Sequence, residues 1–296
     1  MGRYFDPLTD WSFKRLFGGE PGKEILIEFL NDLFAGEKVI TDLVYGPGEH
    51  NGPASDKKKV VFDLFCTGNK GEKFIVEMQR GRQDFFRERS IFYTSRVISD
   101  QLPAGMEHFS YDIPEVYLIA ILEFRMDKEP SEQYFHNICL MDRDSKEIFY
   151  KKLGYKFIEL PNFTKEAEDL ETDVEKWTYL LKNMSRLDQI PVYLNKRIFQ
   201  RIFQIAEISN LTPEEQTMYE ASLKDKWDYE NVLATAMRES KLEGKLEGKL
   251  EGKLEGRLEG ELKAKLETAR EMKAAGLSIS QIAQFTKLSI EEINKL

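Results

Sequence analysis

Two short apolar segments each carry acidic residues, and they constrain the fold more than any other feature of the chain. The first is VVFDLFC, with Asp63 at its centre, and the second is FIVEMQR, with Glu77 and Gln79. Both segments have the composition of buried β-strands. Burying a carboxylate costs several kcal/mol unless a partner or a cation compensates for it. Two such acids on neighbouring strands therefore indicate a metal site.

A hairpin would bring the two acids together. The residues between the strands, 68–72, have the sequence GNKGE, which suits a hairpin loop. A hairpin centred on Lys70 places Asp63 opposite Glu77, with Cβ atoms about 4.5–5.5 Å apart. Gln79 then shares their face, because strand side chains alternate. Oxygen ligands in this arrangement suit Mg²⁺, with Mn²⁺ as the second choice.

The alternative is that the acids line a solvated face of the sheet. Alternation predicts two largely apolar faces, as in a sheet that is covered on both sides. The face with the acids carries Val61, Phe65 and Ile75, and the opposite face carries Phe62, Leu64, Phe74, Val76 and Met78. A register slip of one residue would move Asp63 to the other face, so spacing alone leaves both interpretations open.

The composition is that of a folded protein with a real core. Of its 296 residues 41% are hydrophobic, which suits one large domain or two modest ones. We find neither a signal-peptide pattern nor a run of about 18 apolar residues, so we expect a cytoplasmic protein with no membrane partner. Cys66 and Cys139 are too few for a disulfide framework, and the histidines are too scattered to indicate zinc.

The charge pattern allows an enzyme that acts on nucleic acid. A net charge of −9 argues against a protein that coats nucleic acid non-specifically. However, residues 79–96 carry five arginines against Asp84 and Glu88, and three lysines at 57–59 precede the first acidic segment. These cations are either solvated surface charges or phosphate contacts that hold a polyanion over the metal site, and both interpretations stay open.

The order of the predicted elements indicates an α/β core with a helical extension. Helices are predicted at 11–17, 25–34 and 84–101, and the pattern is again helical from 164 to 239. Strands are predicted at 39–45, in the two acidic segments, and at 115–122, 134–140 and 155–160.

A four-residue unit, Lys/Arg-Leu-Glu-Gly, repeats from Lys241 to Gly260. In a helix its leucine column would drift by about 40° per repeat. Each of its glycines costs about 1 kcal/mol relative to alanine, and like charges fall at i,i+4. The repeat is therefore either a marginal helix that pairs with another helix or a flexible charged spacer. We expect no catalytic role for it, but homo-oligomerisation through it is an open alternative.

The last segment, 269–296, is predicted to form short amphipathic helices. One ends near Gly276, the next is capped by Ser278, and the third starts at Ser289 with Glu292 completing a capping box. The segment is similar to a minimal helix-turn-helix, although a small docking module fits equally well, because its core is too small to be independent. The expected boundaries are 1–238 for the main domain, 239–268 for the repeat and 269–296 for the tail.

Four motifs together resemble the recombination-promoting nuclease / putative transposase family of bacteria, part of the PD-(D/E)XK nuclease superfamily. They are DPLTDWSFKRLFG, VVFDLFC, FIVEMQR and RERSIFYTSRVISDQL. The resemblance covers roughly residues 1–240. It implies a restriction-endonuclease-like core, with a mixed central sheet flanked by helices and a C-terminal helical extension. Asp10 and Lys14 belong to the first motif, and because helix capping and surface charge account for them, we assign them no chemistry.

The resemblance implies a Mg²⁺-dependent DNA endonuclease that promotes recombination or transposition. Asp63 and Glu77 match the two acids that would hold the metal, which activates water and stabilises the reacting phosphate. Gln79 stands where the superfamily usually has lysine, and it would orient the water. A neutral amide can neither act as a general base nor add positive charge.

The resemblance also indicates where nucleic acid would bind. Arg87 and Tyr93 match the helix that follows the second acidic motif, and Arg80 and Arg82 come directly after that motif. We expect these four residues to contact DNA. RNA cleavage at the same site is an open alternative, and so is a catalytically weak, DNA-associated scaffold that self-associates through its tail.

Overall fold

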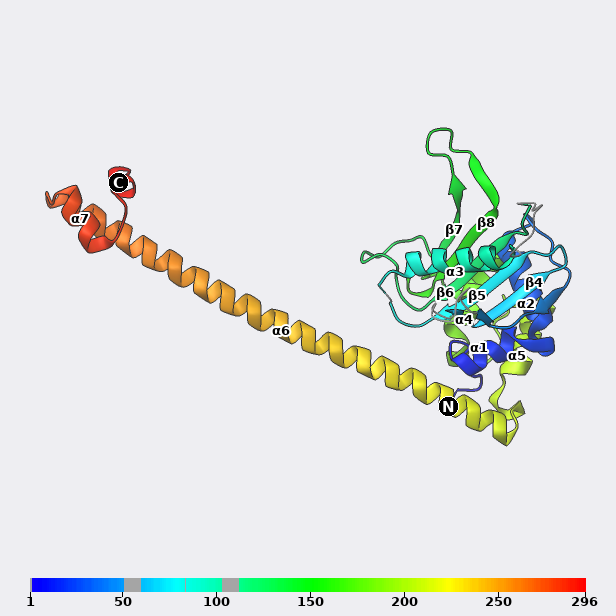
Figure 1. Cartoon of the computed structure of the whole chain (residues 1–296). Helices are drawn as coiled ribbons and strands as arrows, with labels where there is room; N and C mark the ends of the chain where they lie inside the picture. Colours follow the sequence, from blue (N-terminus) through cyan, green and yellow to red (C-terminus); the bar gives the residue numbers. More distant parts are fainter. Residues whose placement is uncertain (1, 51–59, 83, 103–111) are drawn as a thin grey trace. The chain divides into compact units, whose positions relative to one another are not determined.

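The computed structural model describes residues 2–50, 60–82, 84–102 and 112–296 (Figure 1). The chain forms two compact units, residues 1–226 and 227–296. The first unit is a mixed central sheet flanked by helices, and a long helix follows it. This confirms the predicted fold class. The predicted lysine cluster at 57–59 lies outside the described residues.

The sheet of the first unit has six strands. β5, β6 and β8 run parallel, and the remaining neighbours pair antiparallel. Every residue of β6 is buried, as expected for a parallel strand with helices on both faces. In order across the sheet, the strands are β1 (Leu43–Tyr45), β4 (Leu64–Gly68), β5 (Lys73–Gln79), β6 (Val116–Leu122), β8 (Ile148–Glu159) and β7 (Phe135–Met141).

Helices cover both faces of this sheet. Phe17, Phe29 and Trp177 form the centre of one core, with ring centroids 5.1 Å apart for Phe29–Trp177 and 5.2 Å for Phe17–Phe29. On the other face Phe86 packs against Phe157 at 5.2 Å. The first face is covered by α1 (Asp10–Phe17), α2 (Gly19–Phe34), α4 (Asp173–Asn183) and α5 (Arg197–Ala206), and the second by α3 (Phe86–Asp100).

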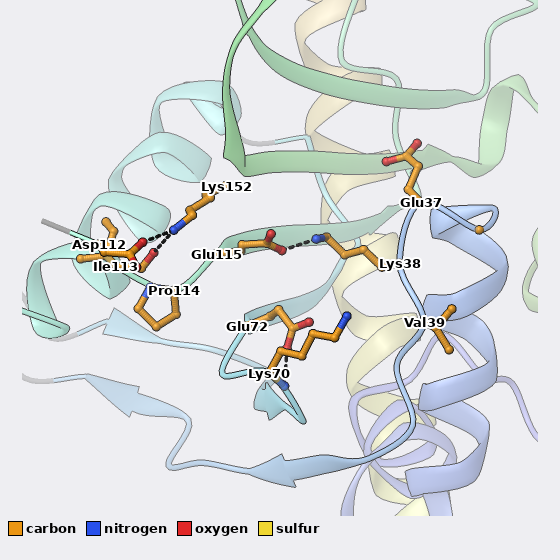
Figure 2. A pocket seen from close by; sticks show the side chains of 11 residues that line it. Glu37, Lys38, Val39, Lys70, Glu72, Asp112, Ile113, Pro114, Glu115 and Lys152 are labelled. Carbon is orange, nitrogen blue, oxygen red and sulfur yellow. Dashed lines mark hydrogen bonds and ion pairs between the residues drawn. The ribbon is translucent and has the colours of Figure 1, made fainter.

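A cavity of about 460 Å³ lies at the amino ends of β5 and β6 (Figure 2). Its charges are largely satisfied by one another: Lys38 pairs with Glu115, and Lys152 pairs with Asp112. Glu72 accepts a hydrogen bond from the hairpin backbone. The predicted catalytic acids do not line this cavity. The cavity lies at the loop end of the β4–β5 hairpin, and the acids lie at its opposite end.

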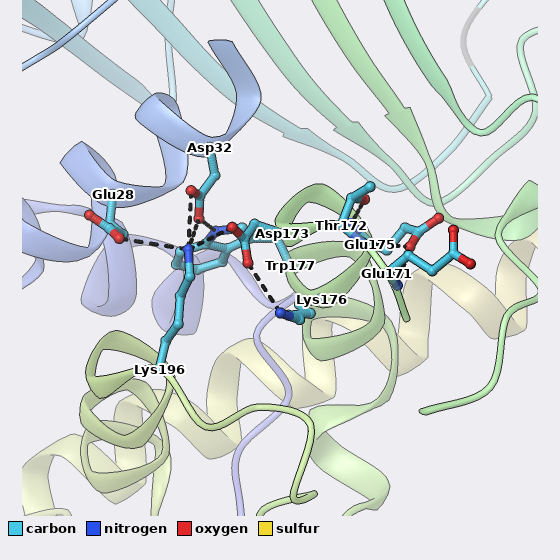
Figure 3. A network of polar contacts seen from close by, with 9 residues as sticks. All are labelled: Glu28, Asp32, Glu171, Thr172, Asp173, Glu175, Lys176, Trp177 and Lys196. Atoms are coloured by element: carbon cyan, nitrogen blue, oxygen red, sulfur yellow. Dashed lines mark hydrogen bonds and ion pairs between the residues drawn. The ribbon is translucent and has the colours of Figure 1, made fainter. Parts of the chain in front are cut away.

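A polar network links three of the helices on the first face (Figure 3). Lys196 Nζ lies 2.8 Å from Asp173 Oδ2 and 3.3 Å from Asp32 Oδ1. The indole Nε1 of Trp177 donates to Asp32 Oδ2 at 2.8 Å. A fully buried indole needs such an acceptor, so Asp32 fixes the orientation of the largest core side chain.

The β4–β5 hairpin has the predicted register. Leu64 pairs with Val76, and Phe65 pairs with Ile75. The connecting loop contains Gly71 at φ +88°, a left-handed conformation that glycine adopts without strain. The register, continued by one residue, places Asp63 opposite Glu77.

The segment VVFDLFC, however, is not the single strand that we predicted. Val60–Val61 form β3, which pairs with β2 (Glu49–His50) in a separate two-stranded sheet, and β4 starts only at Leu64. The strand breaks at residues 62–63 because its two ends pair in different sheets. The alternation of side chains is lost at this break. Phe62 was predicted to share a face with Leu64, but it packs with Phe65, and their ring centroids are 5.9 Å apart.

One helix, α6 (Pro213–Ala274), continues through the whole repeat. The separate helix predicted at 269–276 is therefore wrong: its residues form the last turns of α6 and the glycine that follows, Gly276 at φ +83°. The predicted cap at Ser278 and the predicted capping box at Ser289 are confirmed, and they begin α7 (Ile279–Thr286) and α8 (Ile290–Asn294); Ser278 also forms a capping box, with Gln281. A small core formed by Ala269, Ile282, Leu288 and Ile293 holds these elements together. Among the described residues no helix is long and apolar enough to cross a membrane.

The first turns of α6 are anchored to the sheet by a buried charge. Lys226 Nζ lies 3.0 Å from Asp6 Oδ2 and 2.7 Å from Glu123 Oε1. Replacing Lys226 with Ala leaves two carboxylates without their cation, so we expect the free energy of unfolding to fall by about 3–5 kcal/mol. Urea denaturation measures this change. Lys224→Ala, at an exposed position on the same helix, should change it by less than about 0.5 kcal/mol. Equal effects of the two variants would contradict the assignment.

Candidate active site

Asp63 and Glu77 contact each other across the hairpin. The backbone N–H of Asp63 donates to Glu77 Oε1 at 3.3 Å, and the backbone N–H of Met78 donates to Asp63 Oδ2 at 2.8 Å. Glu77 is only 4% exposed, and Asp63 is half-buried. Each carboxylate thus accepts a backbone hydrogen bond from the opposite segment of the hairpin, near the carboxyl end of β5.

Burial and like charge disfavour ionisation of this pair. Burial raises the pKa of Glu77 to about 8, and the charge of Asp63 adds to the rise. The pKa of Asp63 is raised as well, chiefly by burial, although the hydrogen bond from Met78 opposes the rise. A cation bound between the carboxylates would remove this penalty, since it favours both charged forms.

Gln79 lies beside Glu77, on the same face of β5 as predicted. Its Nε2 donates to Glu77 Oε2 at 2.7 Å. The other oxygen of Glu77 accepts the hydrogen bond from Asp63. Both oxygens are therefore engaged, and the plane of the carboxylate is fixed before any ligand binds.

Helix α3 brings Arg89 and Tyr93 to the same place. Arg89 Nη2 lies 4.0 Å from Glu77 Oε2, and its guanidinium lies over the ring of Tyr93, 5.3 Å from the centroid. The Tyr93 ring in turn packs against Phe62 at 5.2 Å. Tyr93 was predicted, whereas Arg89 was not singled out. The spacing of four residues between them, which places both on one side of a helix, was the available signal.

The other predicted DNA contacts lie elsewhere. Arg87 is exposed and pairs with Asp127 at 2.9 Å. Arg80 directly follows β5. Burial raises the pKa of Glu123, and the charge of Arg80 is among those that oppose this rise. Arg82 is exposed in the segment before α3. Of the four predicted contacts, only Tyr93 is brought to the acids.

The N-terminal motif also influences the site. Asp10 and Lys14 pair with each other on α1 at 2.9 Å. The charge of Asp10 raises the pKa of Asp63, and that of Lys14 lowers it. From the sequence, helix capping and surface charge accounted for these two residues, and their influence on Asp63 is apparent only once the fold brings α1 near it.

A family model of PD-(D/E)XK nuclease family transposases matches residues 7–236, and the chain belongs to this family. The match spans the sheet, α1, α3 and both carboxylates. No curated protein and no solved structure matches the chain. The family supports a nuclease or transposase-like role with DNA as the substrate, and nucleases of this class typically use divalent metal ions.

The residues present fit a hard divalent cation. Two carboxylates and an amide offer oxygen ligands, and Mg²⁺ is commonly held by only one or two carboxylates, with water and phosphate completing its shell. No group of three or more His, Cys, Asp or Glu able to hold a metal occurs within the part of the chain that the structure describes. A cation on the pair Asp63–Glu77 would take its remaining ligands from water or from substrate oxygens.

The raised pKa of Glu77 makes the stability of the metal-free chain depend on pH. The pKa of Glu77 in the folded chain, about 8, exceeds its ordinary value of 4.5, so the protonated carboxyl favours the folded state at low pH. This contribution is fully present below about pH 4.5 and is lost as the pH rises to about 8. In EDTA, we expect wild type to lose on the order of 3 kcal/mol relative to Glu77→Gln between pH 5 and pH 9, as measured by urea unfolding.

Saturating Mg²⁺ at pH 9 should restore much of this stability in wild type and little in Glu77→Gln. A difference between the two proteins that does not change with pH would show that the Glu77 carboxyl has an ordinary environment.

Proposed function

We propose that this protein is a Mg²⁺-dependent DNA endonuclease that promotes recombination or transposition. The observation that supports the proposal most is the close approach of two acids, the buried Glu77 and the half-buried Asp63, whose backbone N–H donates to Glu77 Oε1 on the hairpin of a nuclease-family core. Burying like charges together is unfavourable for folding alone, so the pair is best explained by a cation that it binds.

In this proposal Asp63 and Glu77 hold the ion, Mg²⁺ or Mn²⁺. The ion supplies a Lewis acid for the phosphate and lowers the pKa of a bound water. Gln79 keeps Glu77 in place through its 2.7 Å hydrogen bond and orients the attacking water. Because an amide has no useful pKa, the proton released by the water passes to solvent.

The remaining predicted contacts would bind the DNA backbone. Arg80 and Arg82 follow the acidic strand, and Arg87 and Tyr93 lie on α3. The ion pair of Arg87 with Asp127 is largely exposed, so it contributes little to stability and can be exchanged for a phosphate. These contacts would position the strand and would carry no sequence information.

The decisive measurement is nicking of supercoiled plasmid by the purified full-length chain with Mg²⁺. We expect Asp63→Asn and Glu77→Gln to lower the rate at least about 100-fold, because each removes a ligand from an ion that contributes several kcal/mol. Glu88→Gln, at an exposed acid on α3, should cleave like wild type. Nicking that is equal in wild type and Asp63→Asn would refute the proposal, and faster cleavage of a labelled RNA would reassign the substrate.

A second candidate function, self-association through the tail, is favoured by the exposed leucines of the repeat. Leu250 is 73% exposed, and its counterparts in the neighbouring repeats are similarly exposed. The repeat combines this apolar column with columns of lysine and glutamate, so two copies can match opposite charges. We propose that residues 239–268 form this contact, with 269–296 as a small helical module and 1–238 as the nuclease domain.

We expect the double variant Leu246→Gln, Leu250→Gln to lower the molar mass measured by light scattering, since it removes apolar surface while keeping a high helix propensity. Plasmid nicking should persist. Glu251→Gln, in the same turn of the helix, should leave the mass unchanged at moderate salt. A wild-type chain that is monomeric at high concentration would rule out this contact.

A further inference from the structure

The candidate active site lacks a cation at the position where the superfamily has lysine, because Gln79 occupies it. Cleavage of a phosphodiester builds negative charge on the non-bridging oxygens, and a positioned cation is a large part of its catalysis. We propose that Arg89 of α3 supplies this charge and contacts the reacting phosphate as a catalytic residue. The proposal rests on the nuclease function described above.

The geometry places Arg89 beside the acids. Its Nη2 lies 4.0 Å from Glu77 Oε2, the same oxygen that accepts the 2.7 Å hydrogen bond from Gln79. A separation of 4.0 Å is that of an ion pair and is longer than a hydrogen bond. The guanidinium of Arg89 and the amide of Gln79 thus both approach Glu77 Oε2. Arg89 therefore places a positive charge beside the residue that stands where the superfamily has lysine.

The surroundings of Arg89 hold its guanidinium in place without hiding it. The group stacks over Tyr93 at 5.3 Å, and Tyr93 is itself packed against Phe62. The Arg89 side chain remains 26% exposed. A partly desolvated cation interacts more strongly with a phosphate than one in open water, and it can still be reached.

The neighbouring arginines of α3 point to other partners. Arg87 pairs with Asp127, and Arg96 lies 3.4 Å from Asp100 on its own helix. The ion-pair partner of Arg89 is Glu77, whose Oε2 lies 4.0 Å from its Nη2. Its charge therefore lies beside a carboxylate that would flank a bound phosphate.

The reaction needs no proton from Arg89. The oxygen of a water bonds to phosphorus while the ester P–O bond breaks; one water proton passes to solvent, and the leaving oxygen takes up one proton. The products are a phosphomonoester and an alcohol, with no oxidation or reduction. Arg89 stays protonated throughout, and its planar N–H groups donate to the non-bridging oxygens.

The test is single-turnover cleavage of supercoiled plasmid by the full-length chain in Mg²⁺. We expect Arg89→Ala to lower the rate at saturating protein about 100-fold. Its affinity for a labelled duplex in Ca²⁺ should change by less than about threefold, because a single phosphate contact contributes little to total binding. Arg89→Lys should recover part of the rate. Arg143→Ala, in the exposed turn between β7 and β8, controls for loss of an arginine and should cleave normally.

A second variant keeps the proposal falsifiable if Arg89→Ala is damaged in other ways. Adding Gln79→Lys to Arg89→Ala restores a cation at the superfamily position, and we expect it to recover at least tenfold of the lost rate. The proposal is overturned if Arg89→Ala cleaves at the wild-type rate, if it loses only DNA affinity, or if Gln79→Lys rescues nothing. If wild type itself cleaves no better than Asp63→Asn, the nuclease function fails and this role fails with it.

Discussion

The close approach of Asp63 to Glu77, whose Oε1 accepts a hydrogen bond from the Asp63 backbone N–H, is the constraint on which the rest of the site depends. Glu77 sits on β5, where it pairs with Ala120 of β6, and the ladder between β5 and β4 ends one residue earlier, at Val76. Asp63 sits outside the ladder, at the break between two sheets. This break leaves the backbone N–H of Asp63 available to Glu77. An uninterrupted strand would have held Asp63 in an ordinary cross-strand pair.

Local patterns were sufficient to predict the hairpin, and with it the meeting of the two acids. The loop around Gly71 allows one tight register, and alternation of apolar residues then fixes the faces. The break at Phe62 could not be predicted, because it arises from pairing between β2 and β3, and local spacing does not encode a partner in another sheet. The influence of Asp10 and Lys14 on Asp63 could not be predicted for the same reason, since only the packing of α1 brings their charges near it.

Arg89 was missed because the sequence alone does not fix which side of helix α3 faces the sheet. Five arginines follow the acidic strand, and the sequence does not show which of them faces the sheet. The burial of Phe86, Ser90, Thr94 and Val97 fixes the inner side of α3. Arg89 and Tyr93 lie at the margin of that side, where a long side chain can reach the site and remain partly solvated. In the proposed mechanism Gln79, on a strand, orients the water and Arg89, on a helix, supplies the charge, two tasks that a single lysine usually performs.

The repeat differs from the candidate site, because no buried contact accounts for the stability of its helix. Every residue from Trp227 to Lys265 is exposed. Five glycines together cost about 5 kcal/mol relative to alanine, and the like charges at i,i+4 oppose the helix further. The small core at Ala269, Ile282 and Ile293 supports only its last turns. Propensity alone cannot hold such a helix in water, since isolated helices are marginal even with better residues. Burial of the leucine column against a second chain would supply the missing stabilisation, which links the order of this segment to assembly and not to the chemistry of the hairpin.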